Sequence, residues 1–209
     1  MNFTLWLAAL VAVAAPAPPA PADSAHSLMP VQASVAWGEG RYRIDSLFAV
    51  LIHAPGEDAR LDRALERFRA RLGARTGFGV RLGGGGLVMT VAGPGQAVQT
   101  PDENERYGLE VTPVTVSLAA NTTVGALHGL ETLLQLVESD SAGWYLPAVH
   151  IEDTPRFPWR GLMIDVGRHF EPVEVIQRQL DGMAAVPCLV GLSSCVGQRI
   201  RTTPPFAAA

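Results

Sequence analysis

The chain has 209 residues, of which 48% are hydrophobic and 17% are charged. This balance is typical of a globular protein and excludes a disordered one. Sixteen basic residues, all arginine, stand against twenty acidic ones, and the net charge of -4 argues against a nucleic-acid partner. Two cysteines are too few for a disulfide-dense scaffold or a four-cysteine zinc site.

The first 22 residues have the pattern of a secretory signal peptide. Residues 3–15 form an uncharged apolar run, shorter than the ~20 residues of a membrane-spanning helix but within the ~7–15 of a signal-peptide core. Ala20 and Ala22 are small residues suited to a signal peptidase, so we expect cleavage after Ala22. No Lys or Arg precedes the run, which leaves an uncleaved anchor as the alternative. Either way the chain is exported, periplasmic or secreted, and residues 23–27 form a linker.

Residues 28–154 alternate between strand and helix patterns, as expected for an α/β domain. Strands are predicted at 48–53 and 87–91, and 107–111 with 114–118 should form a hairpin around Thr112-Pro113. A helix is predicted over 59–72, because apolar residues recur there at steps of four, three and four. Gly73 is expected to cap its C-terminus. A second helix is predicted over 123–137, with Thr122 or Thr123 as its N-cap. The two helices should cover one sheet.

Two other patterns in this domain invite a functional interpretation that we do not favour. Gly83 to Gly86 resembles a phosphate-binding loop, but a strand rather than a helix follows and the chain has no lysine, so a surface turn is predicted. His26, His53, His128 and His150 show no metal-ligand spacing and are expected to be packed or surface residues.

Residues 155–186 read as the opening unit of a second domain. Residues 161–166 form a short apolar strand that contains Asp165, and Pro172 then suits the start of a helix. Strand, polar loop and helix open a parallel α/β fold or barrel. In a (β/α)₈ barrel the site lies at the C-terminal ends of the strands, which would place Asp165 and residues 167–170 at the active face.

The stretch PRFPWRGLMIDVGRHFEPVEVI at 155–176 is similar to the Arg-Gly-hydrophobic-Asp-x-x-Arg-His-Phe signature of family 20 glycoside hydrolases, the β-N-acetylhexosaminidases. Residues 28–154, including GALHGLETLLQL at 125–136, also resemble the N-terminal domain of that family. The resemblance implies an N-terminal α+β sandwich-like domain, its sheet covered by two helices, followed by the start of an incomplete TIM (β/α)₈ barrel.

The family resemblance also implies an activity. Its members release terminal GlcNAc or GalNAc from chitooligosaccharides or glycans with retention of configuration. The 2-acetamido oxygen of the substrate attacks the anomeric carbon, an exception to the two-carboxylate scheme. An Asp orients the acetamido group, and the adjacent Glu is the general acid/base. We therefore expect a terminal N-acetylhexosamine as partner, with no cofactor, metal or nucleic acid, and the sequence gives no oligomeric state.

The resemblance ends at about Val186. Family members continue with a second strand and a His-x-His pattern, whereas PCLVGLSSCVGQRIRTTPPFAAA follows here, with Pro187 where a buried strand should begin. The amino-acid usage of the chain indicates GC-rich coding DNA, and a shifted reading frame in such DNA yields Pro, Ala, Arg, Gly and Ser. We interpret residues 187–209 as a disordered, non-family tail of a frameshifted or truncated product. The Asp-Glu pair would lie beyond Val186, so we expect no catalytic residue here and no activity.

Four residues are candidates for the site. Arg160 matches the family arginine that hydrogen-bonds the ring hydroxyls of the terminal sugar, a role that suits a planar fork of donors. The alternative is a structural ion pair between Arg160 and Asp165 or another carboxylate. Asp165, Arg168 and His169 also match the signature and are expected to shape the active face. A carboxylate within an apolar strand needs a partner, here Arg168 or His169.

Two other functions compete with the exported glycosidase. Residues 28–150 alone would suit a non-enzymatic carbohydrate-binding or interaction module. A zinc peptidase is the weakest hypothesis, because the His-Glu-x-x-His pattern is missing.

Overall fold

The computed structural model describes residues 28–97, 100, 102–157, 160–166, 168–185 and 189–193. The expected signal peptide and linker, and residues 194–209 of the tail, lie outside the described residues. None of the helices within the described ranges combines the length and the apolar character that a bilayer crossing requires.

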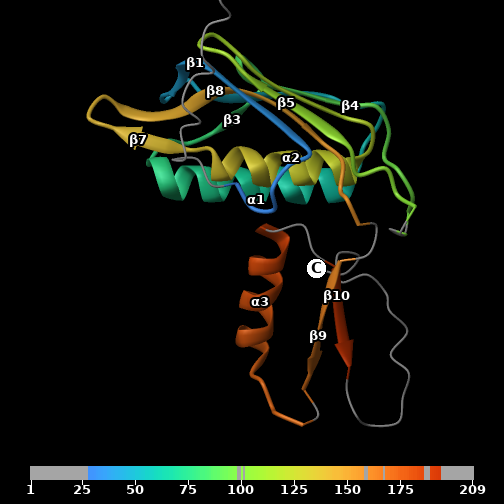
Figure 1. Cartoon of the computed structure of the whole chain (residues 1–209). Helices are drawn as coiled ribbons and strands as arrows, with labels where there is room; N and C mark the ends of the chain where they lie inside the picture. The colour runs from blue at the N-terminus through green and yellow to red at the C-terminus, as the bar shows by residue number, and fades with distance from the viewer. Residues whose placement is uncertain are drawn as a thin grey trace, which may run out of the picture.

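Residues 28–153 form a mixed sheet with two helices packed on one of its faces (Figure 1). Strands β2, β3, β4 and β6 run parallel, whereas β5 is antiparallel to both β6 and β8, and β1 and β7 are antiparallel to β8. The strand order is β1-β8-β5-β6-β4-β2-β3. The strands are β1 Ser34–Ile44, β2 Ala49–His53, β3 Arg81–Leu82, β4 Gly86–Val91, β5 Tyr107–Val111, β6 Val116–Ala120, β7 Glu138–Asp140 and β8 Gly143–Asp153.

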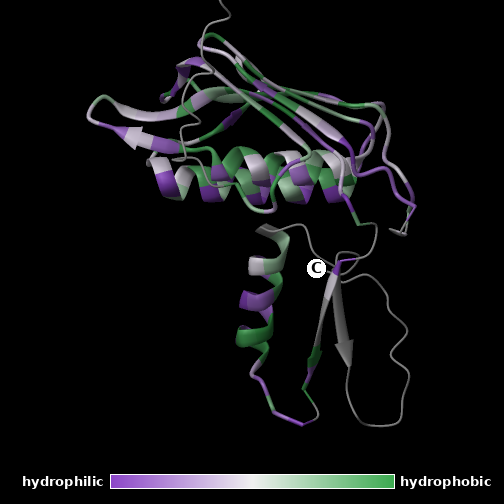
Figure 2. Ribbon diagram, in the orientation of Figure 1, coloured by the Kyte–Doolittle hydropathy of each residue, from purple (hydrophilic) through white to green (hydrophobic). Residues whose placement is uncertain are grey.

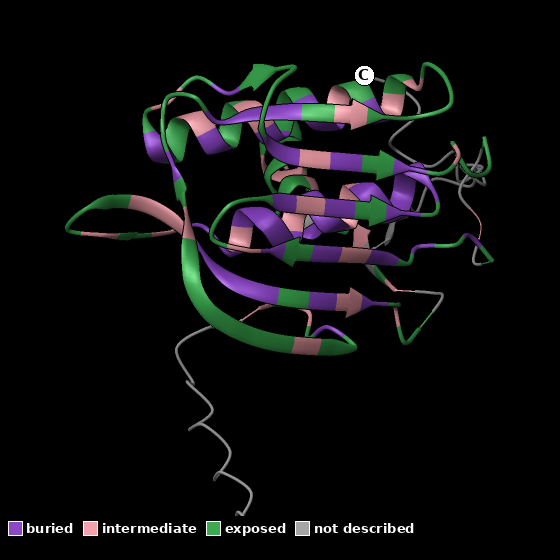
Figure 3. Cartoon of the chain, turned by 90° about the horizontal axis from the view of Figure 1, so that it is seen from above, coloured by how far each residue is buried: buried purple, intermediate pink, exposed green. Residues whose placement is uncertain are grey.

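The core lies between the sheet and helices α1 (Ala59–Thr76) and α2 (Thr123–Gln135). The helices turn their apolar sides toward the sheet and their polar sides outward (Figure 2). Along the central strands buried and exposed residues alternate, because successive side chains point to opposite faces (Figure 3). The largest fully buried side chains include Phe68, Leu72, Leu87, Met89, Leu109, Leu118, Leu133 and Ile151. The expectation of a sheet covered by two helices is confirmed.

Helix α1 is one turn longer than its apolar periodicity predicted, and the assignment of Gly73 as its cap was wrong. The helix continues to Thr76, and Gly77 adopts the left-handed conformation at φ 79°, with its N–H bonded to the carbonyl of Gly73. Gly73 lies inside the helix, where a Cβ would lie 3.1 Å from the carbonyl oxygen of Phe78. A glycine at position 73 therefore admits the returning chain, and the next glycine ends the helix.

Other local predictions are confirmed with small shifts at the boundaries. Strands β5 and β6 form the expected antiparallel hairpin, and Thr122 caps α2 by accepting a hydrogen bond from the N–H of Gly125. Residues 83–85 form the predicted turn between β3 and β4, and Gly86 begins β4. Strands β1, β3, β7 and β8 were not predicted. Strand β8 ends at Asp153, within the expected domain bounds of 28–154.

The second unit consists of β9 (Gly161–Asp165), α3 (Val173–Ala185) and β10 (Leu189–Ser193). Strand β10 pairs with β9 in parallel along five residues, so the predicted strand-loop-helix unit extends to a second strand. The expectation that residues 187–209 are disordered was wrong for residues 189–193. Strand β10 begins at Leu189, two positions after Pro187, which the sequence places where a buried strand should begin.

Candidate functional site

The four predicted site residues lie at the two ends of β9 and are not brought together. Arg160 immediately precedes the strand, whereas Asp165 is its last residue, and Arg168 and His169 follow in the loop before α3. A strand rises about 3.3 Å per residue, so about 16 Å separates the Cα atoms of Arg160 and Asp165. The start of β9 faces the N-terminal domain, and its end lies on the far side of the unit (Figure 1).

Arg160 is anchored at the junction between the two units. Its Nη2 donates to Oε2 of Glu105 in an ion pair, and its Nη1 donates to the backbone carbonyl of Phe157. The Arg160 side chain is 19% exposed and that of Glu105 only 6%. The structure therefore shows the ion pair to another carboxylate that was the alternative for Arg160.

His128 of α2 lies against the same carboxylate. Its Nδ1 is 3.7 Å from Oε2 of Glu105, and this nitrogen makes no hydrogen bond to any described residue. Burial of the ring lowers the pKa of His128 to about 4. The nearby carboxylates of Glu105 and Asp153 act in the opposite direction, and the charge of Arg160 adds to the lowering. His128 is therefore neutral at pH 7, and Glu105 has Arg160 as its cationic partner.

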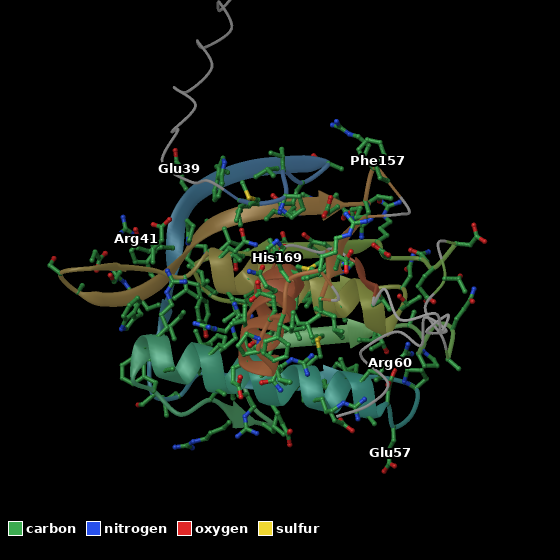
Figure 4. The ribbon with its side chains drawn as sticks, turned by 90° about the horizontal axis from the view of Figure 1, so that it is seen from below. Glu39, Arg41, Glu57, Arg60, Phe157 and His169 are labelled. Atoms are coloured by element: carbon green, nitrogen blue, oxygen red, sulfur yellow. The ribbon has the colours of Figure 1, made fainter. Side chains whose placement is uncertain are left out.

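The other end of β9 is open to solvent. Asp165 accepts a hydrogen bond from the backbone N–H of Arg168 at 3.2 Å, and its Oδ2 lies 3.2 Å from Nε of the same residue. Of the two partners expected for Asp165, Arg168 and His169, the structure shows Arg168 in contact with it. The Arg168 side chain is 80% exposed, and His169 is exposed as well. In the view from below, His169 lies well apart from Phe157, which marks the Arg160 end (Figure 4).

Sequence reasoning missed Glu105 as a site residue and assigned His128 no role, yet both left a signal. Glu105 shares the parity of Tyr107 and Leu109, which are buried beneath the helices, so its side chain points inward too. His128 lies four residues from both Val124 and Thr132, each of which is buried in α2. Because the side chains of Glu105 and His128 both point inward, this pattern predicts a buried polar contact between them.

The opposite face of the sheet carries a separate shallow hollow. Arg106 points there because it follows Glu105 in the chain, and it pairs with Glu152 at 3.2 Å. The hollow has a volume of about 290 Å³ and is floored by small residues such as Gly108 and Ala119. None of the predicted site residues lines it. Within the described residues, no group of three or more His, Cys, Asp or Glu side chains could hold a metal ion.

Comparison with known proteins adds an independent line of evidence. Residues 25–154 match the family model described as glycosyl hydrolase family 20, domain 2, and residues 157–188 match the catalytic domain of the same family. The chain is 49% identical over 82 residues to the β-hexosaminidase subunit β of Mus musculus, an alignment that covers 39% of this chain and 15% of that protein.

Solved structures show the same likeness. The chitobiase of Flavobacterium johnsoniae is 37% identical, with a TM-score of 0.71 over 79% of this chain and 26% of that one. A Streptomyces plicatus β-hexosaminidase mutant, solved with its product GlcNAc, is 28% identical, with a TM-score of 0.64 over 79% of this chain and 34% of that one. The chain thus spans about a sixth to a third of the length of these relatives. Because the domain 2 match alone covers more than half of its residues, the chain belongs to glycosyl hydrolase family 20.

Proposed function

We propose that this chain is the N-terminal part of an exported β-N-acetylhexosaminidase, which releases terminal GlcNAc or GalNAc from chitooligosaccharides or glycans. The observation that carries the proposal is the unit β9-α3-β10. It follows the family's domain 2 and has the parallel strand-helix-strand order with which an α/β barrel begins, and its β9 and α3 lie within the match to the family's catalytic domain. Arg160, Asp165, Arg168 and His169 belong to its stretch that resembles the family signature. The chitobiase and the GlcNAc-bound hexosaminidase among its relatives support this substrate class.

The mechanism proposed for the complete enzyme is substrate-assisted and retaining. The acetamido oxygen of the substrate attacks the anomeric carbon and the leaving oxygen departs, giving an oxazolinium intermediate that water opens. A Glu protonates the leaving oxygen, and a neighbouring Asp stabilises the positive charge that develops on the acetamido group. Arg160 contributes to binding, because the planar fork of donors of a guanidinium suits the ring hydroxyls of the terminal sugar.

We further propose that the 209 residues alone do not hydrolyse the substrate. The carboxylates at the loop end of β9 and the start of α3 are Glu171, Glu174 and Asp165, the last of which pairs with Arg168. None of these positions corresponds to the acid of the family. Without a general acid the reaction loses roughly 10²–10⁴-fold in rate, and the orienting carboxylate adds to this loss.

The test is an assay of two purified polypeptides on an aryl N-acetyl-β-glucosaminide. One is the 209-residue chain, and the other is the product of the same locus read in a shifted frame after codon 186. We expect turnover only from the second polypeptide, and a lower kcat/KM after Arg160→Ala in it. Turnover by the 209-residue chain would contradict the proposed inactivity. If neither polypeptide hydrolyses the substrate but both bind GlcNAc, the carbohydrate-binding module is the better function.

A further inference from the structure

The backbone that carries Glu105 is fixed by helix α2. Thr122 donates from its hydroxyl to the carbonyl of Asn104 at 2.6 Å. Gly125, in the first turn of the helix, lies so close to the strand that a Cβ there would be 2.5 Å from the carbonyl oxygen of Arg106. The residues on both sides of Glu105 are therefore held against the start of α2. The carboxylate of Glu105 is presented from a rigid part of the N-terminal domain.

The guanidinium of Arg160 is held at two of its nitrogens. Glu105 accepts from Nη2 and the carbonyl of Phe157 accepts from Nη1. A planar guanidinium with two fixed acceptors has one orientation, since rotation about its Nε–Cζ bond would break both contacts.

The surroundings of Glu105 leave Arg160 as the cation that Glu105 pairs with. His128 is close enough to compete for Oε2 but is neutral at pH 7 because it is buried. Asp153, the other carboxylate that acts on His128, accepts a hydrogen bond from the N–H of Ala33 at 3.0 Å. The buried negative charge of Glu105 is therefore paired with the guanidinium of Arg160.

We propose that Glu105 is a positioning residue for Arg160, so that the N-terminal domain orients the arginine at the entry to the first barrel strand. The inference deepens the proposed function, because the importance of this orientation for catalysis rests on the sugar-binding role of Arg160. It assigns the N-terminal domain a direct contribution to the sugar site through one buried carboxylate.

The first measurement reads the guanidinium itself in the 209-residue chain labelled with ¹⁵N and ¹³C. In the wild type we expect the Nη signals of Arg160 to be resolved, because rotation of the group is hindered. Glu105→Gln should merge them and speed the exchange of their protons with water at least tenfold, whereas Glu105→Asp should restore part of the protection. Glu152→Gln, which removes an exposed carboxylate paired with Arg106, is the control and should change nothing at Arg160.

Unchanged Arg160 signals in Glu105→Gln would overturn the proposal. Amide spectra of each variant establish that it is folded. If Glu105→Gln does not fold, Glu105→Asp replaces it in the comparison with the wild type.

The second measurement separates this inference from the proposed function by titrating N-acetylglucosamine into the polypeptide read in the shifted frame after codon 186 and into its variants. We expect Arg160→Ala to abolish binding and Glu105→Gln to raise the Kd at least tenfold. If Arg160→Ala weakens binding and Glu105→Gln does not, the positioning role is wrong and the sugar-binding role stands. If the wild type does not bind the sugar, or Arg160→Ala has no effect, the sugar-binding role is wrong. The guanidinium signals then decide by themselves whether Glu105 orients Arg160.

Discussion

Arg160 and Glu105 lie 55 positions apart in the chain, and their ion pair joins the first barrel strand to the N-terminal domain. A buried carboxylate that loses its cation keeps a charge that water no longer solvates. The pair therefore makes the stability of the N-terminal domain depend on a residue outside it.

Removal of Arg160 should destabilise the N-terminal domain. We expect Arg160→Ala to lower the free energy of unfolding by about 3 kcal/mol, since it leaves Glu105 buried and unpaired. The double variant with Glu105→Ala should lose less than the sum of the two single losses. Urea unfolding followed by circular dichroism measures these values. Arg168→Ala is the control, because its exposed pair with Asp165 contributes about 0–1 kcal/mol. Additive losses would show that the two side chains do not interact.

The free energy of unfolding should fall as the pH is lowered, already at pH values where most carboxylates are still ionised. The pKa of His128 is lowered from an ordinary 6.5 to about 4 in the folded chain, so the unfolded chain binds this proton more readily. The loss therefore begins as the pH falls through about 6.5 and continues toward 4, and linkage gives about 2 kcal/mol between pH 6.5 and 4.5. Glu105, Asp153 and Arg160 are the charged groups that face the ring.

Urea unfolding at several pH values tests this dependence. His128→Leu should remove most of the slope between pH 6.5 and 4.5, while the exposed His150→Gln should leave it unchanged. An identical slope in His128→Leu and the wild type would contradict the assignment.

Two glycines in helices should respond to alanine in opposite ways. An alanine usually stabilises a helix by about 0.5–1 kcal/mol relative to glycine. At Gly125 the added Cβ would meet the backbone of Arg106, so we expect Gly125→Ala to cost about 1–3 kcal/mol. Gly182 in α3 has open space around it, and Gly182→Ala should not destabilise the chain. A neutral Gly125→Ala would mean that α2 can move away from the strand.

Asp58 should stabilise the starts of both helices. Its side chain caps α1 by accepting from the N–H of Arg60 at 2.9 Å, and it accepts from the hydroxyl of Thr123 in α2 at 2.6 Å. Asp58→Ala should therefore lower the free energy of unfolding by about 1–2 kcal/mol. Asp58→Asn keeps an acceptor for the cap and should lose less. Equal losses in thermal unfolding would show that the charge, paired with Arg60, matters more than the cap.

The sequence by itself determined the local elements with strong periodicity. Apolar residues recur at steps of three and four along the buried faces of the helices. Buried residues alternate with less buried ones along β5 and β6, on either side of a proline-containing turn. The signature around Arg160 and Asp165 identified the family. The need of a strand carboxylate for a partner predicted that Asp165 contacts Arg168 or His169, and Arg168 makes that contact. These features depend on residues that are near one another in the chain.

The strands at the edge of the sheet, β1 and its neighbour β8, could not be predicted from periodicity. Strand β1 is exposed along most of its length, so its sequence lacks the alternation that marks a half-buried strand. Strand β8 is recognised only once β1 and β5 lie on its two sides. The helix end at Gly77 rather than Gly73 was equally undecided, because either glycine can adopt a left-handed conformation and packing against Phe78 chose between them.

Only the tertiary structure decided how the candidate site is built. The sequence placed Arg160 near Asp165, but an extended strand holds their Cα atoms about 16 Å apart. The partner of Arg160 is instead Glu105, which lies just before β5, where the chain packs against α2. The burial of Glu105 and the lowered pKa of His128 arise from the same packing. Periodicity reports which face a side chain occupies, whereas the choice of partner depends on which distant segments the fold brings together.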